Sequence, residues 1–372
     1  MRFADARPES PRPAPKLGDR TDLTGRRSAP AARGGGDYPL SGYRVIEVGS
    51  GAVAPEITRI LGEYGADVIK LESRQQVDFM RLQGPDIESS VGWSSSNRNK
   101  RSVLLDLKNP EGNRIGRALA AKADIIVENN TGGVMDRLGL GYSELSVANP
   151  KLVYLSSQAF GSTGPASSYG GFGPSNQALS GVSYLWNEPD APAPEGVQVI
   201  FPDIILGRAG ALAIIAALDE TERTGQGQHI DMGQAELAMA CIGEAFIESD
   251  LLGESAPARG NHLPIGAPWG VFPSLAEDSW IAITVESDDQ WRALKSVVNN
   301  PGWDDPSFDT VAGRLENRDF IEAELSAFTS QSTAVALMRR LQSAGVPAGA
   351  AYDTAQVLAD VHLAQRGWPV TV

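Results

Sequence analysis

"YRVIEVGSGAVAPEITRILGEYGADVIKLES", residues 43–73, decides the fold of this chain. Two short apolar runs rich in branched residues, 45–48 and 68–71, bracket a stretch with helical spacing that begins near Pro55. A strand, a glycine turn, a helix and a second strand make a β-α-β unit, whose two strands are parallel. The unit predicts an α/β fold.

The same pattern continues along the chain. "RSVLLDL" (101–107) is strand-like, 109–123 is helical with Pro110 at its start, and 124–129 is a strand. Another strand follows at 151–157. Alternation of this kind predicts a Rossmann-like, doubly wound parallel sheet.

Changes in composition and in the pattern of predicted elements divide the chain into five expected parts. From about Arg259 a hairpin and polar helices replace the β-α-β pattern, which predicts a smaller α+β domain. The expected parts are a disordered leader (1–36), a large Rossmann-like domain that would carry the ligand site (37–225), linker helices (226–258), the small domain (259–355) and a return segment (356–372) that ends sooner than expected.

Charge and composition exclude several classes of protein. The formal net charge of the 372 residues is −14, which disfavours nucleic acid or an anionic membrane as the main partner. A single cysteine, Cys241, allows no internal disulfide and suits a cytoplasmic location. The three histidines lie far apart without metal-ligand spacing, so no metal site is expected. Asp203 and Arg208 interrupt the best candidate for a membrane span, so none is expected.

Asp203 is the residue that the sequence leaves unexplained. It follows Pro202 near the start of "VIFPDIILGRAGALAIIAAL" (199–218), whose other residues are typical of a buried helix. A helix N-terminus supplies unpaired N–H groups and a positive dipole end, which favour an ionised carboxylate. From its position alone, Asp203 is either a helix cap or a reactive carboxylate.

An ordered set of motifs settles the family that the chain resembles. "YGADVIKLE" (64–72), "NRNKRSVLLDLKNPEG" (97–112), "ADIIVENNTGGVMDRLGLGYSEL" (123–145), "NPKLVYLSSQAFGSTGP" (149–165), "TGQGQHID" (224–231) and "RGNHLPIGAPWGVFP" (259–273) follow one another in this order. Together they resemble the class III CoA-transferase family, from about Leu40 to Gly367. The resemblance implies an acyl-CoA:carboxylate CoA-transferase whose catalytic group is the aspartate of "PDIILGRAG", Asp203. The implied reaction passes through a covalent aspartyl intermediate, and its substrates are acyl-CoA and a carboxylic acid.

The resemblance also implies a binding site for coenzyme A. Arginine and lysine side chains beside strand ends suit its phosphates. The positions that match CoA-contacting positions of the family are Arg74, Leu105, Lys108, Asn129, Asn130 and Arg137. Five aromatic residues are candidates for an apolar acyl pocket: Trp93, Phe172, Tyr184, Trp186 and Trp269.

Some positions depart from the family pattern and keep alternatives open. Phe172 and Gly173 stand where a racemase relative has a histidine and an aspartate, and Ala52 replaces a glutamine of the transferases. A two-base racemisation needs a second base, so these departures favour CoA transfer. The alternatives are an acyl-CoA racemase or isomerase that uses Asp203 as a base, and a CoA-binding subunit of a heteromeric transferase. The family implies an interlocked homodimer, or a heterodimer with a paralogue.

Overall fold

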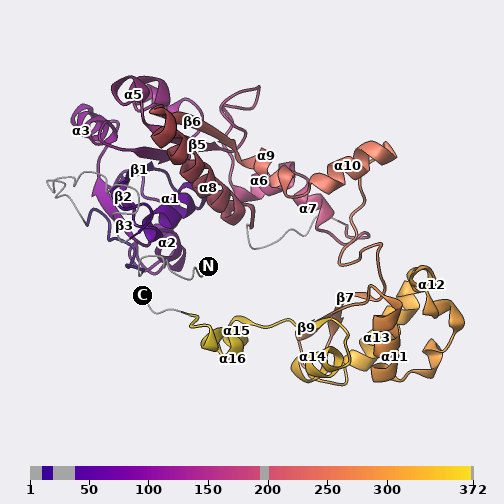
Figure 1. Cartoon of the computed structure of the whole chain (residues 1–372). Helices are drawn as coiled ribbons and strands as arrows, with labels where there is room; N and C mark the ends of the chain where they lie inside the picture. The colour runs from indigo at the N-terminus through magenta and orange to yellow at the C-terminus, as the bar shows by residue number, and fades with distance from the viewer. Residues whose placement is uncertain (1–10, 20–37, 193–200, 370–372) are drawn as a thin grey trace. The chain divides into compact units, whose positions relative to one another are not determined.

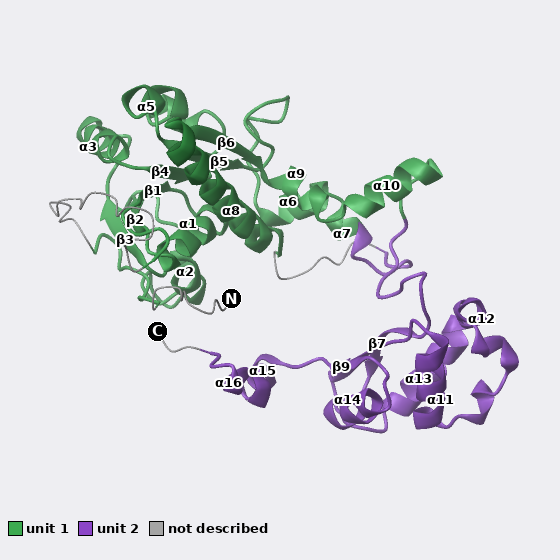
Figure 2. Cartoon of the chain, viewed as in Figure 1, with its two compact units in different colours: residues 1–184, 196–256, 372 green, residues 185–195, 257–371 purple. Residues whose placement is uncertain are grey.

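The computed structural model describes residues 11–19, 38–192 and 201–369. They form two compact units, each with its own core (Figure 2). Unit 1 comprises residues up to 184 together with 196–256, and unit 2 comprises 185–195 together with 257–371.

A six-stranded parallel sheet forms the centre of unit 1 (Figure 1). The strand order is β3-β2-β1-β4-β5-β6, so the order reverses between β1 and β4. Ligands of doubly wound folds bind at this reversal, outside the carboxyl ends of the strands. The strands are β1 (Arg44–Val48), β2 (Asp67–Glu72), β3 (Lys100–Leu104), β4 (Ile125–Glu128), β5 (Val153–Gln158) and β6 (Gln228–Gly233).

Helices cover both faces of this sheet, which explains why central strands such as β4, IIVE, are apolar and buried on both faces. One core joins the sheet to helices α1 (Val53–Glu63) and α8 (Phe201–Thr224). A second core joins the opposite face to α3 (Pro110–Ala120), α4 (Val134–Arg137) and α5 (Tyr142–Ala148). The parallel α/β fold expected from the sequence is confirmed.

Helix α8 packs against α1 through glycines that leave no room for a side chain. A Cβ atom on Gly207 would lie 2.3 Å from Cγ of Glu56, and one on Gly210 would lie 2.5 Å from Cδ1 of Ile57. Asp203 precedes Gly207 by four residues and therefore lies on the same face of α8. The glycines thus bring Asp203 to the start of α1.

Helix α8 is also long and apolar enough to cross a membrane, which the sequence analysis did not expect. The two interrupting charges do not disqualify it by length and composition. Half of its most apolar stretch is buried within the structure, as in the core helix of an α/β sheet.

Shorter helices complete unit 1. They include the 3₁₀ turn η1 and follow the second strand, the fifth strand and the last strand of the sheet. Their bounds are η1 (Arg81–Gln83), α2 (Val91–Ser96), α6 (Gly173–Leu179), α7 (Val182–Leu185), α9 (Gln234–Ala240) and α10 (Gly243–Leu252).

Unit 2 is an α+β body built on a three-stranded antiparallel sheet of order β7-β8-β9. Its core contains Trp291 and Trp303, whose ring centroids are 4.9 Å apart. The elements are β7 (Trp269–Pro273), β8 (Trp280–Thr284), α11 (Asp288–Val298), η2 (Pro301–Trp303), η3 (Pro306–Asp309), α12 (Val311–Glu316), α13 (Arg318–Thr329), α14 (Ala334–Ser343), β9 (Ala348–Ala350), α15 (Thr354–Leu358) and α16 (Val361–Gln365).

The observed units differ from the expected parts in three places. Residues 185–195, expected in the large domain, cluster with unit 2. Residues 226–256 cluster with the large unit instead of forming a separate linker, because β6 pairs with β5. Within the expected disordered leader, residues 11–19 lie against the large unit: the carbonyl of Pro15 accepts from Arg81, and the amide of Gly18 donates to Ser102. The rest of that leader and the last three residues of the return segment lie outside the described residues.

Candidate active site

A cavity of about 510 Å³ lies at the carboxyl edge of the parallel sheet. Its walls come from the turn between β1 and α1, the end of β4, the end of β5 and the start of α8. This is the place where the strand order reverses, and it is where the fold offers a ligand site. Asp203 lines this cavity, and we call it the Asp203 cavity.

The carboxylate of Asp203 is buried and poorly solvated. The residue is 8% exposed, and its Oδ1 has no hydrogen-bond partner among the described residues. Burial raises the pKa of Asp203 to about 6. The position at a helix N-terminus predicts that the ionised form is favoured, but desolvation outweighs that effect. A carboxylate with this pKa is still mostly ionised at neutral pH, and it is a better nucleophile than a solvated one.

The turn between β1 and α1 forms one wall of the cavity, and two asparagines hold it. The Asn129 side chain accepts from the Ser50 amide at 3.0 Å and donates to the Ser50 carbonyl at 2.8 Å. The Asn130 side chain donates to the Val48 carbonyl at 2.8 Å. Both asparagines follow β4, so they tie its end to the end of β1 across the strand reversal.

A cluster of buried charged side chains also holds the β1–α1 turn. Glu47 is fully buried between Lys70 and Lys100, whose Nζ atoms lie 2.6 and 2.9 Å from its carboxylate oxygens. Lys70 also donates to the Gly49 carbonyl, and Lys100 donates to the Pro55 carbonyl. The two lysines lower the pKa of Glu47 to about 2, against the effect of burial, which by itself raises it.

Comparison with known proteins identifies the family of this chain. A family model described as CoA-transferase family III matches residues 40–372. The chain belongs to CoA-transferase family III. It is 35% identical over 350 residues to a "Probable CoA-transferase" of Mycobacterium tuberculosis, covering 91% of this chain and 43% of that protein. The chain therefore spans less than half the length of that relative.

Two further relatives cover most of both chains. A "Succinyl-CoA--D-citramalate CoA-transferase" of Chloroflexus aurantiacus is 32% identical over 331 residues, covering 88% of this chain and 82% of that protein. The crystal structure of a CaiB/BaiF family protein from Brucella suis has a TM-score of 0.83 and is 33% identical, covering 90% of this chain and 89% of that chain. Family and relatives indicate a CoA-transferase.

A second cavity adjoins the Asp203 cavity and a third adjoins the second, and their linings include most positions that the CoA-transferase resemblance selected. A cavity of about 530 Å³ is lined by Leu105, Lys108 and Asn130, and it shares Asn130 with the Asp203 cavity. A third cavity, of about 650 Å³, is lined by Lys108 and Arg137. Asn129 lines the Asp203 cavity itself. The selected positions thus follow one track along the carboxyl edge of the sheet.

Arg74 is the selected position that this track does not include. Its side chain is exposed, and it lines none of the three cavities, although Ser73 and Gln75 on either side line the second one. A flexible arginine in this loop is close to the track without forming part of its wall.

Sequence reasoning missed an aromatic pair at the junction of the first two cavities. The rings of Phe79 and Phe172 meet edge to face with centroids 5.8 Å apart, and both residues line both cavities. Gly51, which has φ of +78°, lies under this pair, and a Cβ there would lie 2.8 Å from the Phe79 ring. Of the five aromatic residues suggested for an acyl pocket, only Phe172 lines the Asp203 cavity within the described structure. Trp93 is instead buried beneath the Arg81 guanidinium, 3.5 Å from its ring centroid.

No group of three or more His, Cys, Asp or Glu side chains in residues 11–19, 38–192 and 201–369 is placed to hold a metal ion. The lining of the Asp203 cavity itself offers a substrate one carboxylate, several amide and hydroxyl side chains, and apolar side chains.

Proposed function

We propose that this chain moves CoA between organic acids with Asp203 as the nucleophile. The observation that carries the proposal is the buried Asp203 carboxylate, whose Oδ1 lacks a hydrogen-bond partner among the described residues. Its cavity adjoins the second cavity, which Leu105 and Lys108 line. A charged oxygen left without hydrogen bonds is costly to a fold, which makes a chemical role a reason for its presence.

The first half of the reaction transfers CoA to the enzyme. An Asp203 oxygen attacks the thioester carbonyl carbon of the acyl-CoA, and the C–S bond breaks to give a mixed anhydride and a CoA thiolate. The thiolate then attacks the aspartyl carbonyl carbon of the anhydride. The donor acid leaves as its carboxylate, and Asp203 carries CoA as a thioester.

The second half repeats these steps with the acceptor. The acceptor carboxylate attacks the aspartyl thioester and releases the CoA thiolate, which leaves a second mixed anhydride. Attack of the thiolate on the acceptor acyl carbon gives the new acyl-CoA and restores the Asp203 carboxylate. One thioester replaces another, so no external energy source, oxidant or proton donor is needed.

The walls of the cavity support these steps in two ways. Phe79, Phe172 and Ile204 line it with apolar surface, which keeps water from hydrolysing the anhydride. Ala52 and Val53 line it at the N-terminus of α1, where the first-turn N–H groups have no partner within the helix. These N–H groups are our candidates for stabilising the oxyanion of each tetrahedral intermediate.

For CoA itself we propose the six positions that the family pattern selects. Lys108, Arg137 and Arg74 supply positive charge for the phosphates, and Leu105 supplies an apolar contact. Asn129 and Asn130 already bond the β1–α1 turn, so their proposed role is to shape the wall along which the pantetheine arm runs.

The alternatives are weaker on the same geometry. A racemase needs two bases on opposite sides of the α-carbon. Among the described residues that line the Asp203 cavity, Asp203 is the only acid, and no histidine, lysine or cysteine accompanies it. A non-catalytic CoA-binding subunit would have no need for a buried, unpartnered carboxylate.

Substrates and assembly are proposed from the relatives. One relative is named for succinyl-CoA and D-citramalate, so a small organic acid is the first acceptor to test. We propose a homodimer, which is the assembly that the family resemblance implies.

Intact-protein mass spectrometry tests the proposed nucleophile. Purified protein is mixed with succinyl-CoA, acetyl-CoA and an aromatic acyl-CoA, with and without D-citramalate. We expect a CoA-sized or acyl-sized adduct on the wild type and none on Asp203→Asn. Asp219→Asn, an exposed aspartate on the same helix, is the matched control and should carry the adduct. Transfer without any adduct, or an adduct on Asp203→Asn, would contradict the aspartyl route.

A further inference from the structure

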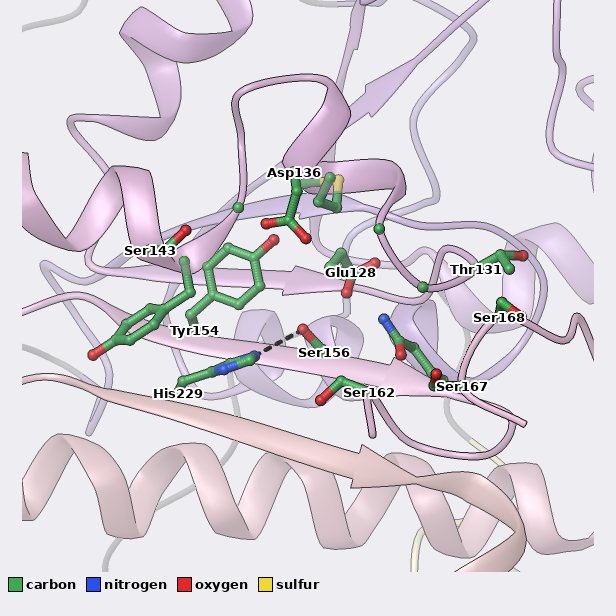
Figure 3. A pocket seen from close by; sticks show the side chains of 16 residues that line it. Glu128, Thr131, Asp136, Ser143, Tyr154, Ser156, Ser162, Ser167, Ser168 and His229 are labelled. Carbon is green, nitrogen blue, oxygen red and sulfur yellow. Dashed lines mark hydrogen bonds between the residues drawn. The ribbon is translucent and has the colours of Figure 1, made fainter. Parts of the chain in front are cut away.

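A separate polar cavity of about 450 Å³ lies over β5, on the face of the sheet that α4 and α5 cover (Figure 3). Its walls come from the end of β4, from β5, from His229 on β6 and from the loops on either side of α4. It meets the Asp203 cavity only at Thr131 and Gln158, which line both. We call it the Glu128 cavity after its most buried acid.

Glu128 brings a carboxylate into this cavity without a cationic partner. The residue is 2% exposed, and its Oε2 accepts from the backbone and side-chain N–H groups of Asn130 at 2.8 and 3.2 Å. A hydrogen bond with Ser156 also favours its ionised form, yet burial prevails and raises the pKa of Glu128. A buried carboxylate held only by neutral donors gains strongly from a cation brought to it.

Two further acceptors line the same space. Gln158 is 9% exposed, and its Oε1 has no hydrogen-bond partner among the described residues. The carboxylate of Asp136, on α4, points into the cavity toward the Tyr154 hydroxyl (Figure 3). That hydroxyl already donates to the Leu140 carbonyl at 3.1 Å, so it leaves the Asp136 carboxylate to another donor.

An aromatic wall closes the other side. The Tyr142 ring stacks on the His229 ring with centroids 5.0 Å apart, and Tyr154 meets His229 edge to face at 5.5 Å. Nε2 of His229 lies 3.0 Å from the Ser156 hydroxyl. Burial lowers the pKa of His229, so the imidazole is neutral at physiological pH and adds no positive charge. Aromatic faces of this kind attract cations.

Among the described residues, no lysine or arginine lines this cavity. The neighbouring arginine, Arg137, lines the third cavity, which we propose for CoA. Two carboxylates, an unpartnered amide oxygen and an aromatic wall therefore face a space that holds hydrogen-bond acceptors and lacks a fixed cation. We propose that the Glu128 cavity binds a small organic cation, a primary ammonium or guanidinium compound.

This site goes beyond the proposed CoA transfer and does not depend on it. Its ligand would be recognised by Glu128 and Asp136, neither of which lines the Asp203 cavity. Asp136 also lines the third cavity beside Lys108 and Arg137, so Glu128, which lines only its own cavity, separates the two sites. Binding can therefore be measured on the protein alone, without any acyl-CoA. If no cation binds, the proposal of CoA transfer at Asp203 still stands. If Asp203 forms no adduct, the proposal of a cation site at Glu128 still stands.

Isothermal titration calorimetry with three probes that share a four-carbon chain tests the proposal. Butane-1,4-diamine and butylguanidine carry the expected cation, and butane-1,4-diol is their neutral counterpart. The net charge of −14 attracts cations to the whole surface, so the titrations are run in 0.15 M salt, which screens exposed charges. We expect saturable binding of at least one cation, with one site per chain, and no binding of the diol.

Three variants locate the site. Glu128→Gln and Asp136→Asn should each weaken binding of the cation by tenfold or more. Asp136 is exposed, so its variant tests the site even if Glu128→Gln fails to fold. Glu144→Gln makes the same chemical change on α5 outside the cavity and should alter the affinity by less than twofold. Absence of saturable binding, equal binding of the diol, or equal losses in Glu144→Gln and Asp136→Asn would overturn the proposal.

Discussion

Asp203 combines a cost to stability with a proposed gain in reactivity. Its pKa of about 6 in the folded chain lies above the ordinary 3.8, because the folded state buries the carboxylate. The folded state therefore holds the proton more tightly than the unfolded state. This contribution to stability is complete below pH 3.8 and is lost as the pH rises through about 6.

Asp203→Asn should therefore lose activity and gain stability. At pH 7 we expect the free energy of unfolding to rise by roughly 1–3 kcal/mol, because the amide replaces a buried charge. Transferase activity should fall by about a thousandfold or more, as expected for loss of a nucleophile. Thermal unfolding of both proteins at pH 4 and pH 7 checks the first point. The gain should shrink at pH 4, and a variant less stable than the wild type at pH 7 would contradict the assignment.

The same pKa predicts the acid limb of the reaction. Protonated Asp203 cannot attack a thioester, so kcat/KM for acyl-CoA should fall about tenfold per pH unit below about pH 6. Initial rates between pH 5 and pH 8 measure this limb, with circular dichroism at each pH to confirm that the chain remains folded. A rate that stays constant down to pH 5 would mean that the attacking group has an ordinary carboxyl pKa.

At the scale of elements, the spacing of Asp203, Gly207 and Gly210 explains why the carboxylate reaches the cavity. The two glycines let α8 approach α1, because any larger residue at these positions would place a Cβ atom against Glu56 or Ile57. Asp203, one turn before Gly207, is carried to the start of α1 by this contact. The pair of helices thus positions the proposed nucleophile beside the β1–α1 turn.

Gly207→Ala tests this packing. The added methyl would lie 2.3 Å from Cγ of Glu56, so the helices must separate. We expect a loss of about 1–3 kcal/mol in the free energy of unfolding and a several-fold lower kcat. Gly243→Ala is the matched control, because no atom lies within 4 Å of its added Cβ, and it should be neutral or slightly stabilising. Equal effects of the two changes would show that close packing at Gly207 does not position Asp203.

The elements themselves could largely be predicted from the sequence. The runs at 45–48 and 68–71 became β1 and β2, since apolar strands buried on both faces leave a strong local signal. The hairpin expected after Arg259 became β7 and β8. The helix expected within 199–218 is α8, although it extends to Thr224.

What the sequence could not predict depends on contacts between distant segments. Glu47, Lys70 and Lys100 come from three strands, and nothing in their spacing along the chain indicates that they share one buried cluster. The same holds for the Glu128 cavity, whose lining runs from Glu128 to His229. The family pattern selects Asn129 as a ligand of CoA. In the structure its side chain also forms two hydrogen bonds to the Ser50 backbone and so holds the β1–α1 turn, which the sequence does not indicate.

At the scale of the whole molecule, each unit has its own core, yet one helix of unit 1 has none of its side chains buried. Helix α10 follows α9 and leaves Phe246, Ile247, Leu251 and Leu252 exposed, at 49, 64, 79 and 56%. Four large apolar side chains on ten residues cost free energy in water, at about 25 cal/mol for each Å² of apolar surface. A partner chain that covers them would recover it.

Leu251→Glu should therefore disrupt the homodimer that we propose. Light scattering coupled to size exclusion should give the wild type twice the chain mass of 39.4 kDa and shift the variant toward a single chain. Leu275→Glu places the same charge on a leucine that is 61% exposed in unit 2, and it should leave the mass unchanged. If the wild type itself elutes as a single chain at micromolar concentration, α10 is not covered by a second copy, and the dimer proposal fails. If Leu251→Glu stays dimeric, burial of α10 against the partner is not what holds the two copies together, because a buried, unpaired glutamate at that position would be costly.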